Sequence, residues 1–174
     1  LLMQPNSKAN AYSTLVESLP ATGRLVLPNV DADYLILNPH LDPKLQPADT
    51  VLVPALPRSL VVVGDNGPCT VNYVPGLEAP AYVDQCVPKG EWWQFNKQVD
   101  TVWLVQPTGQ VHELNIGLWN RQTQVVPMPG AWLVAPTRNS VLTPEIAPRM
   151  ADFLATQGPA QIPSTKVKQA DVTD

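Results

Sequence analysis

The sequence predicts an α+β fold in which one short helix packs on a mixed sheet of four or five strands. Three observations lead to this prediction. Short apolar runs rich in β-branched residues recur between residues 59 and 135. Turn-forming sequences rich in Pro and Gly separate them. One intervening stretch has apolar residues at helical spacing. Strands combined with a single helix predict a helix layer packed on a sheet, which is the α+β class.

Five strands are expected in this sheet. Ser59–Gly64 and Thr70–Val74 flank an Asp-Asn-Gly-Pro turn and form a first hairpin. Thr101–Val105 and Gln110–Leu114 form a second hairpin around a Pro-Thr-Gly turn. After a Pro-Met-Pro-Gly turn, Ala131–Ala135 closes the sheet.

A short helix over Glu78–Cys86 lies between the two hairpins, with Tyr82, Val83 and Cys86 available to face the sheet. The resulting order of two strands, a helix and three strands is the β-grasp arrangement. A helix crossing between strands predicts that the first and third strands are parallel neighbours with a right-handed connection.

The chain before the sheet contains a weak helical pattern and a partial copy of the strand layout. Within residues 1–19, Ala11, Leu15, Val16 and Leu19 form one apolar stripe. Gly23–Leu27 and Asp49–Pro54 repeat the spacing of two strands between residues 109 and 136, which indicates a preceding unit cut short at its N-terminus. A chance match of two short strand patterns is the alternative.

An amphipathic helix is predicted after the sheet. Thr143 is the expected N-cap with Pro144 at the first helical position, although Pro148 would shift the start to Ala147. The apolar positions of this helix are Ile146, Met150, Phe153 and Leu154. Polar residues interrupt the stripe, which favours docking on the protein's own sheet over a membrane.

Four regions follow from these elements. Residues 1–56 form an incomplete first β-grasp-like unit with an N-terminal helix, and residues 57–137 form a β-grasp domain. Residues 138–158 contain the C-terminal amphipathic helix, and residues 159–174 are a polar tail expected to be disordered. The chain starts with Leu1 rather than Met, which is expected of a fragment, a processed product or a trimmed chain.

Composition narrows the class of function. The 174 residues carry a net charge of −4, so a nucleic-acid partner, which demands a basic face, is not expected. Charged residues make up 15% and Pro is frequent at 20 residues, which is typical of a folded, loop-rich chain. No apolar run approaches the roughly 20 residues that span a bilayer.

Two cysteines, Cys69 and Cys86, are the only ones in the chain. Their spacing does not match a zinc site, and no metal or cofactor is predicted. They form either a disulfide between neighbouring elements or two small buried thiols. A disulfide would imply an oxidising compartment.

Candidate binding residues are aromatic or basic. Trp92 and Trp93 are adjacent, so on a strand they point to opposite faces and one stays near the surface, where it could stack on a sugar or a partner. Trp119 with Arg121, and Arg24 separately, could hold an anionic or planar group. For each, a structural role is the alternative.

Motifs of enzymes are not found. No nucleophile elbow, zinc-protease or nucleotide-binding glycine pattern occurs. A glycan-modifying hydrolase would need two carboxylates facing one cleft. The acidic residues that could supply these carboxylates lie mostly at turns and element ends, and no two form an obvious pair. They are Glu78, Asp84, Glu91, Asp100 and Glu113. No catalytic residue is assigned.

One family resemblance emerges from the motifs. The pattern W-N-R-x-x-x-V-x-P-M-P-G-A-x-L-V at residues 119–134, preceded by QPTGQV at 106–111, resembles capsule biosynthesis accessory proteins of the GfcC/YjbG type. Further segments fit in the same order, and the resemblance spans about residues 10–157. They are TGRLVLP at 22–28, DTVLVPALPRSLVVVG at 49–64, VPGLEAPAYVDQC at 74–86 and PEIAPRMADFLATQ at 144–157.

The resemblance implies tandem SLBB-like β-grasp domains in a periplasmic, non-enzymatic protein of capsule or exopolysaccharide export. Its expected partner is the outer-membrane polysaccharide export channel or the surface polysaccharide itself, and Arg24 matches an arginine associated with a pocket between domains. A soluble SLBB-type module for a glycan, with Arg24, Trp119 and Arg121 as contacts, is the second reading. The chain departs from the family in lacking the first N-terminal strands and in its two cysteines.

Overall fold

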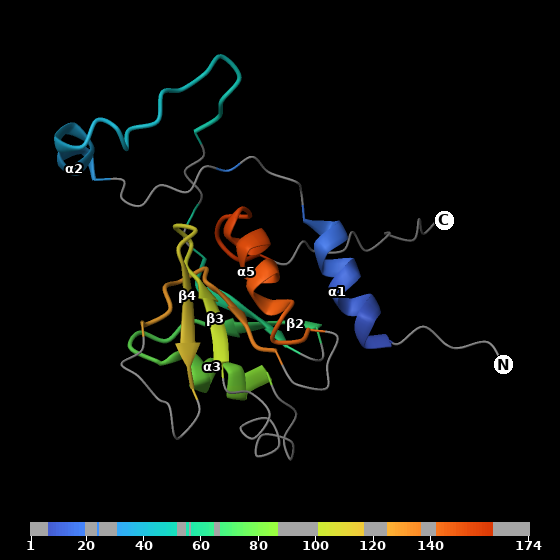
Figure 1. Cartoon of the computed structure of the whole chain (residues 1–174). Coiled ribbons are helices and arrows are strands. Elements are labelled where there is room, and N and C mark those ends of the chain that lie inside the picture. The colour runs from blue at the N-terminus through green and yellow to red at the C-terminus, as the bar shows by residue number, and fades with distance from the viewer. Residues whose placement is uncertain are drawn as a thin grey trace, which may run out of the picture.

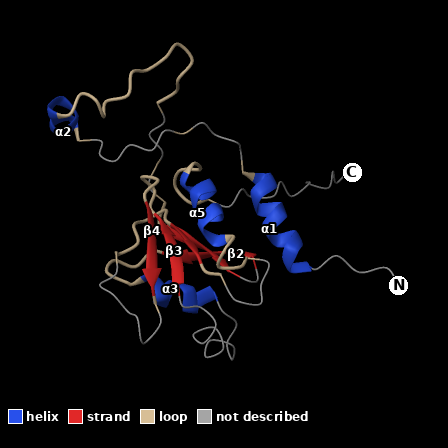
Figure 2. Cartoon of the chain, in the orientation of Figure 1, coloured by secondary structure: helices blue, strands red, loops and turns tan. Residues whose placement is uncertain are grey.

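The structure, a computed structural model, shows an open sheet with helices on both faces (Figure 1). It describes residues 7–19, 24, 31–51, 55, 57–64, 67–86, 101–116, 125–136 and 142–161. Helices α1 and α5 cover one face of the sheet, and α3 crosses the other (Figure 2). The chain is therefore α+β, as predicted.

The five-stranded sheet has the order β2-β1-β5-β3-β4. Its strands are β1 (Ser59–Gly64), β2 (Gly67–Asn72), β3 (Thr101–Val105), β4 (Val111–Asn115) and β5 (Trp132–Val134). The predictions for β1 and β3 are confirmed residue for residue. β2 begins earlier than predicted and includes Pro68, which an edge strand tolerates because one side of its backbone has no partner strand.

The pairing of the central strands differs from the prediction. β1 pairs in parallel with β5, and Val62 lies opposite Leu133. β3 pairs antiparallel with β5, so the predicted parallel contact between β1 and β3 is wrong. All three residues of β5 are buried, and a strand that is apolar on both faces belongs at the centre of a sheet. β5 therefore separates the two hairpins.

Helix α3 (Ala79–Cys86) covers one face of the sheet. Tyr82 and Val83 are fully buried there in a cluster with Leu60, Leu104 and other residues of the strands. The Tyr82 hydroxyl accepts from Val74 N at 2.8 Å and donates to Val74 O at 2.7 Å. The predicted helix and its inward face are thus confirmed.

Cys69 on β2 and Cys86, the last residue of α3, form a disulfide with a Cα–Cα distance of 5.9 Å. The bond ties the end of α3 to an edge strand. No group of His, Cys, Asp or Glu able to hold a metal occurs in the described ranges. Among the same ranges, no helix is long and apolar enough to cross a membrane.

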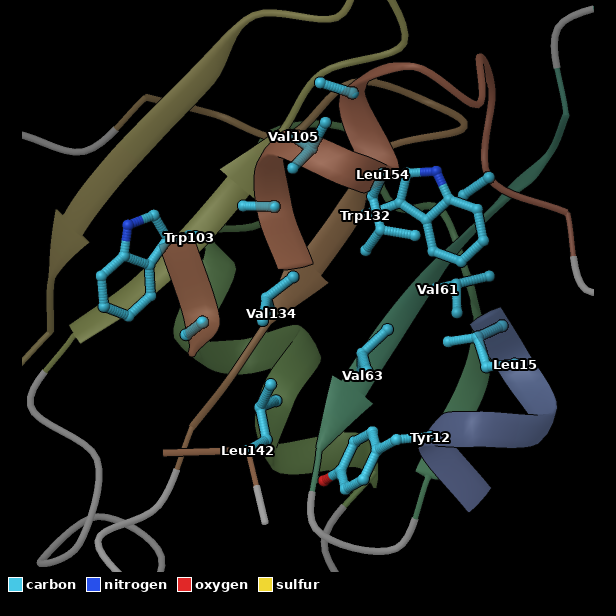
Figure 3. Close-up of a cluster of buried hydrophobic side chains, with 14 residues drawn as sticks. Tyr12, Leu15, Val61, Val63, Trp103, Val105, Trp132, Val134, Leu142 and Leu154 are labelled. Carbon is cyan, nitrogen blue, oxygen red and sulfur yellow. The ribbon is translucent and has the colours of Figure 1, made fainter. Parts of the chain in front are cut away.

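Helix α1 (Ser7–Ser18) packs on the opposite face (Figure 3). Tyr12 and Leu15 point toward Val61 and Val63 of β1, and the Tyr12 hydroxyl donates to Gly64 O. The predicted stripe is partly wrong: Leu15 and Leu19 pack inward, but Val16 is 37% exposed. Tyr12, one helical turn before Val16, is buried in the core instead.

Helix α5 (Ala147–Ala155) lies beside α1 on the same face. Its N-cap is Ile146, because Pro148 limits the helix to the later of the two predicted starts; the prediction of Thr143 as N-cap is wrong. Thr143 O still accepts from Ala147 N at 3.0 Å, which closes a turn ahead of the helix.

The buried face of α5 is built mainly from small residues. Ala147, Ala151, Leu154 and Ala155 are buried against the sheet, whereas Ile146 is 44% exposed and Phe153 is half-buried. Small side chains let the helix approach Trp103 and Trp132 closely. The predicted docking of this helix on its own sheet is confirmed.

The region before β1 is less regular. Helix α2 (Ala32–Leu37) forms between the two stretches predicted as strands of the partial unit. The predicted strand at Asp49–Pro54 is absent from its described part, Asp49–Val51. The predicted strand at Gly23–Leu27 lies outside the described residues except for Arg24, as does most of the predicted tail. The proposed domain boundaries therefore stay predictions.

Candidate binding site at one end of the sheet

Five chain segments meet where β3 ends and where β1, β4 and β5 begin. The β3–β4 turn (residues 106–110) and the segment 125–130, here called the PMPG loop, lie side by side there. Residues 57–59, 157–160 and Arg24 contact them. We call this arrangement the loop end of the sheet.

Gln106 holds the two loops together. Its side chain is only 4% exposed. Its Nε2 donates to Val126 O at 3.0 Å, and its Oε1 accepts from Met128 N at 3.0 Å. One amide therefore satisfies a backbone donor and a backbone acceptor of the PMPG loop, which fixes the loop's conformation.

Gly130 fixes the other side of the PMPG loop. Its φ of 81° is left-handed, and a Cβ at this position would lie 2.8 Å from Pro57 Cγ and 3.0 Å from Pro159 Cβ. Gly130 N donates to Ser59 O at 2.8 Å, and Gly130 O accepts from Ala160 N at 2.7 Å. Only glycine meets both the backbone and the packing requirement.

The braced loop presents apolar side chains to solvent. Val125, Val126 and Met128 are exposed, with Met128 at 43%, while Pro127 between them is buried. Exposed apolar residues on a rigid loop lose little conformational entropy when they bind. The loop end is therefore suited to contact with another molecule.

Arg24 reaches the loop end from the N-terminal region. Its Nη2 donates to Pro107 O at 2.6 Å, and its side chain is half-buried. Its Nη1 is buried without a hydrogen-bond partner among the described residues, and a Cβ at Gly158 would lie 3.3 Å from it. One side of the guanidinium thus positions the β3–β4 turn, and the other retains donor capacity.

The segment after α5 is held against the same end. The indole Nε1 of the buried Trp132 donates to Gly158 O at 3.3 Å. Gln157 donates from Nε2 to Thr156 Oγ1, while its Oε1 is buried without a partner among the described residues. These contacts join α5 to the loop end.

Of the predicted site residues, only Arg24 is placed here. Trp92, Trp93, Trp119 and Arg121 lie outside the residues that the structure describes. Gln106 and Gly130 were missed as site residues. A polar residue directly after the apolar run TVWLV was the available signal for Gln106, since such a position predicts a buried side chain in need of partners.

Among the described residues, two carboxyl groups have a shifted pKa, and neither lies at the loop end. Burial raises the pKa of Asp84 on α3, although its side chain as a whole is exposed. A hydrogen bond from the Thr143 side chain, followed by one from its own backbone N–H, lowers the pKa of Glu145. Glu113 pairs with Trp103 on the α5 face, so the sheet separates it from Asp84.

Comparison with known protein families gives a match within the second half of the chain. Residues 95–156 match the family described as Capsule biosynthesis GfcC C-terminal. The matched stretch contains β3, β4, the PMPG loop, β5 and α5. No curated protein matches the chain. The resemblance noted from the sequence is thereby confirmed over residues 95–156.

Proposed function

We propose, from the match of residues 95–156 to the Capsule biosynthesis GfcC C-terminal family, that the protein is a non-enzymatic periplasmic accessory protein of capsule or exopolysaccharide export. It acts by binding the export channel through the loop end of the sheet. The observation that carries this proposal is the coincidence of the family match with the PMPG loop, which is braced from both sides yet exposes Val126 and Met128.

The sheet topology supports an SLBB-like β-grasp domain. The two hairpins flank the central strand β5, which pairs in parallel with β1, and one helix, α3, follows the first hairpin in sequence and covers one face of the sheet. In a β-grasp protein, loops at the ends of such a sheet are free to vary without changing the core. The loop end is one of these two ends.

The disulfide supports a location in the periplasm. Disulfides persist in oxidising compartments and are rare where thiols are kept reduced. The Cys69–Cys86 bond joins two ordered elements, so it stabilises the folded domain.

The side chains at the loop end favour a protein partner. Val125, Val126 and Met128 are aliphatic, and such side chains fill apolar pockets on proteins, whereas sugar rings stack preferentially on aromatic faces. The export channel is therefore the preferred partner.

A glycan ligand is the second candidate, and the Nη1 of Arg24, which has no hydrogen-bond partner among the described residues, favours it. A guanidinium with donor capacity to spare suits the carboxylate of an acidic sugar. In this reading Trp92, Trp93, Trp119 and Arg121 would add contacts, and the protein would act as a soluble ligand-binding module. An enzymatic role in glycan modification is the weakest of the three.

Titration calorimetry separates the candidates. The full chain is titrated with the purified periplasmic part of the export channel encoded in the same genome, and separately with capsular oligosaccharide. We expect binding to the channel, weakened about tenfold by Met128→Ser, because an anchor side chain of this size contributes roughly 1.4 kcal/mol or more. Ile146→Ser, at an equally exposed site on another surface, is the matched control.

Three results would count against the channel proposal. Binding to oligosaccharide alone, abolished by Arg24→Gln, would establish the glycan module in its place. Equal effects of Met128→Ser and Ile146→Ser would remove the loop end as the contact. Binding to neither ligand would contradict both candidates.

A further inference from the structure

Residues 31–51, here called the arm, expose apolar side chains away from the sheet. Helix α2 and the loop after it lie apart from the strands in Figure 1, and α2 has no buried residue. Ile36 is 74% and Leu37 is 80% exposed. Leu45 and Val51 are also exposed. Several exposed large apolar side chains on one short segment indicate an interaction site.

The arm is ordered by its own side chains. The Asp31 carboxylate accepts from Tyr34 N at 2.9 Å, and the Asn38 side-chain amide donates to Tyr34 O at 2.9 Å. The Asp49 carboxylate accepts from Gln46 N at 2.6 Å. Both ends of α2 and the turn beyond it are thus capped locally.

This order does not arise from core packing. A helix of six residues is too short to be stable by itself, and helices in proteins gain most of their stability from burying an apolar face. Three prolines between residues 39 and 47 further restrict the arm. Local caps and prolines, rather than core packing, therefore restrict the arm, and this restriction lowers the entropic cost of docking.

Charge indicates what the arm docks on. It contains four Asp and one Lys, so it carries most of the chain's net charge of −4. Asp33 and Asp42 are exposed, as are Ile36 and Leu37. A surface that complements the arm has an apolar pocket flanked by Lys or Arg.

We infer that the arm inserts Ile36 and Leu37 into an apolar pocket rimmed by basic side chains on a partner protein. An anionic bilayer would repel the four aspartates, since membrane-surface helices carry basic residues. A second copy of this acidic chain offers poor charge complementarity, and aliphatic side chains do not favour a glycan. The partner is defined by its apolar pocket and basic rim, so this inference does not require that the partner be the export channel.

Photo-crosslinking in the native envelope tests the inference. The full chain is expressed in its own cells with Leu37→p-benzoylphenylalanine, and the cross-linked peptide is mapped by mass spectrometry. The matched control is Ile146→p-benzoylphenylalanine on the exposed start of α5. We expect a single protein adduct at position 37, mapped to apolar residues flanked by Lys or Arg, that does not form at position 146.

Variants identify the forces involved. Ile36→Ser should reduce the yield of the adduct about tenfold, as expected for a residue at the centre of an interface. Asp33→Asn combined with Asp42→Asn should reduce it severalfold, whereas Asp152→Asn on α5 should leave it unchanged. Circular dichroism checks that each variant keeps the wild-type melting curve, since all these side chains lie outside the core.

The inference is overturned if position 37 yields no protein adduct, or one with a second copy of this chain. It is also overturned if the cross-linked surface lacks basic residues or if the aspartate variants have no effect. An adduct with a basic protein other than the export channel would support the inference while contradicting the proposed function.

Discussion

Gln106 is the residue that decides whether the PMPG loop keeps its shape. Gln106→Met has a similar volume but leaves Val126 O and Met128 N without their partners. We expect a loss of about 1–3 kcal/mol in the free energy of unfolding, the usual cost of unsatisfied buried groups. Urea denaturation measures it, with Thr108→Ala on the exposed tip of the neighbouring turn as control. Equal stability of the two variants would show that the amide does not brace the loop.

Alanine substitutions at Gly130 and Gly76 separate the cost of backbone strain from the cost of close packing. Gly76 has a similar φ of 76°, but no atom lies within 4 Å of its added Cβ, whereas Gly130 faces Pro57 at 2.8 Å. Gly76→Ala should cost roughly 1–2 kcal/mol from backbone conformation alone. Gly130→Ala should cost about 1–3 kcal/mol more because the prolines must move. Thermal denaturation of both variants gives the difference, and similar losses would refute the close packing.

At the residue scale, the sequence predicted which residues could bind a ligand or form a turn, but not which distant residues contact them. Arg24 was recognised as a candidate, and the structure adds that its Nη2 holds Pro107 O. The Pro-Met-Pro-Gly turn was recognised, but the prolines against Gly130 come from positions 57 and 159, far away in sequence. Contacts between such distant segments leave no periodic signal in a single sequence.

Helix α3 carries a carboxylate in an unfavourable place. Asp84 lies in the last turn of the helix, where the dipole disfavours negative charge, and burial raises its pKa. A raised pKa in the folded state favours the protonated form. This contribution to stability is therefore present below the pKa of the unfolded chain and is lost as pH rises through the folded value.

Asp84→Asn should therefore stabilise the protein at pH 7 by roughly 0.3–1 kcal/mol, the scale of a helix-dipole interaction. The gain should vanish near pH 3, where the wild-type carboxyl is protonated. Urea denaturation of both proteins at the two pH values provides the comparison. A gain of the same size at pH 3 would mean that charge is not its cause.

At the scale of elements, the apolar runs predicted where strands lie in the sequence, but not which strands pair with one another in the sheet. The runs SLVVVG and TVWLV correspond to β1 and β3 residue for residue. Their separation by β5 was not foreseen, because a run that is apolar on both faces shows that a strand is central but not which strands flank it. For α5, Pro148 indicated the later start correctly.

At the scale of the whole molecule, α1 and the sheet form one core (Figure 3). The helix predicted for the first unit therefore packs on the five-stranded sheet. Leu15→Ala should destabilise the entire fold by about 2–4 kcal/mol, as for other buried leucines. Val16→Ala, at the adjacent exposed position, should have little effect. Denaturation of both variants tests the packing, and an unaffected Leu15 variant would show that α1 is not part of the core.

We propose the loop end of the sheet as the binding surface for the export channel. Hydrogen exchange of the full chain, free and in complex with the periplasmic part of the channel, tests it most directly. We predict slower exchange at the amides of Val125 and Val126 and of the turn at residues 108–110, with unchanged exchange in α3. Protection confined to α3 and the disulfide edge, with the PMPG loop unaltered, would contradict the account.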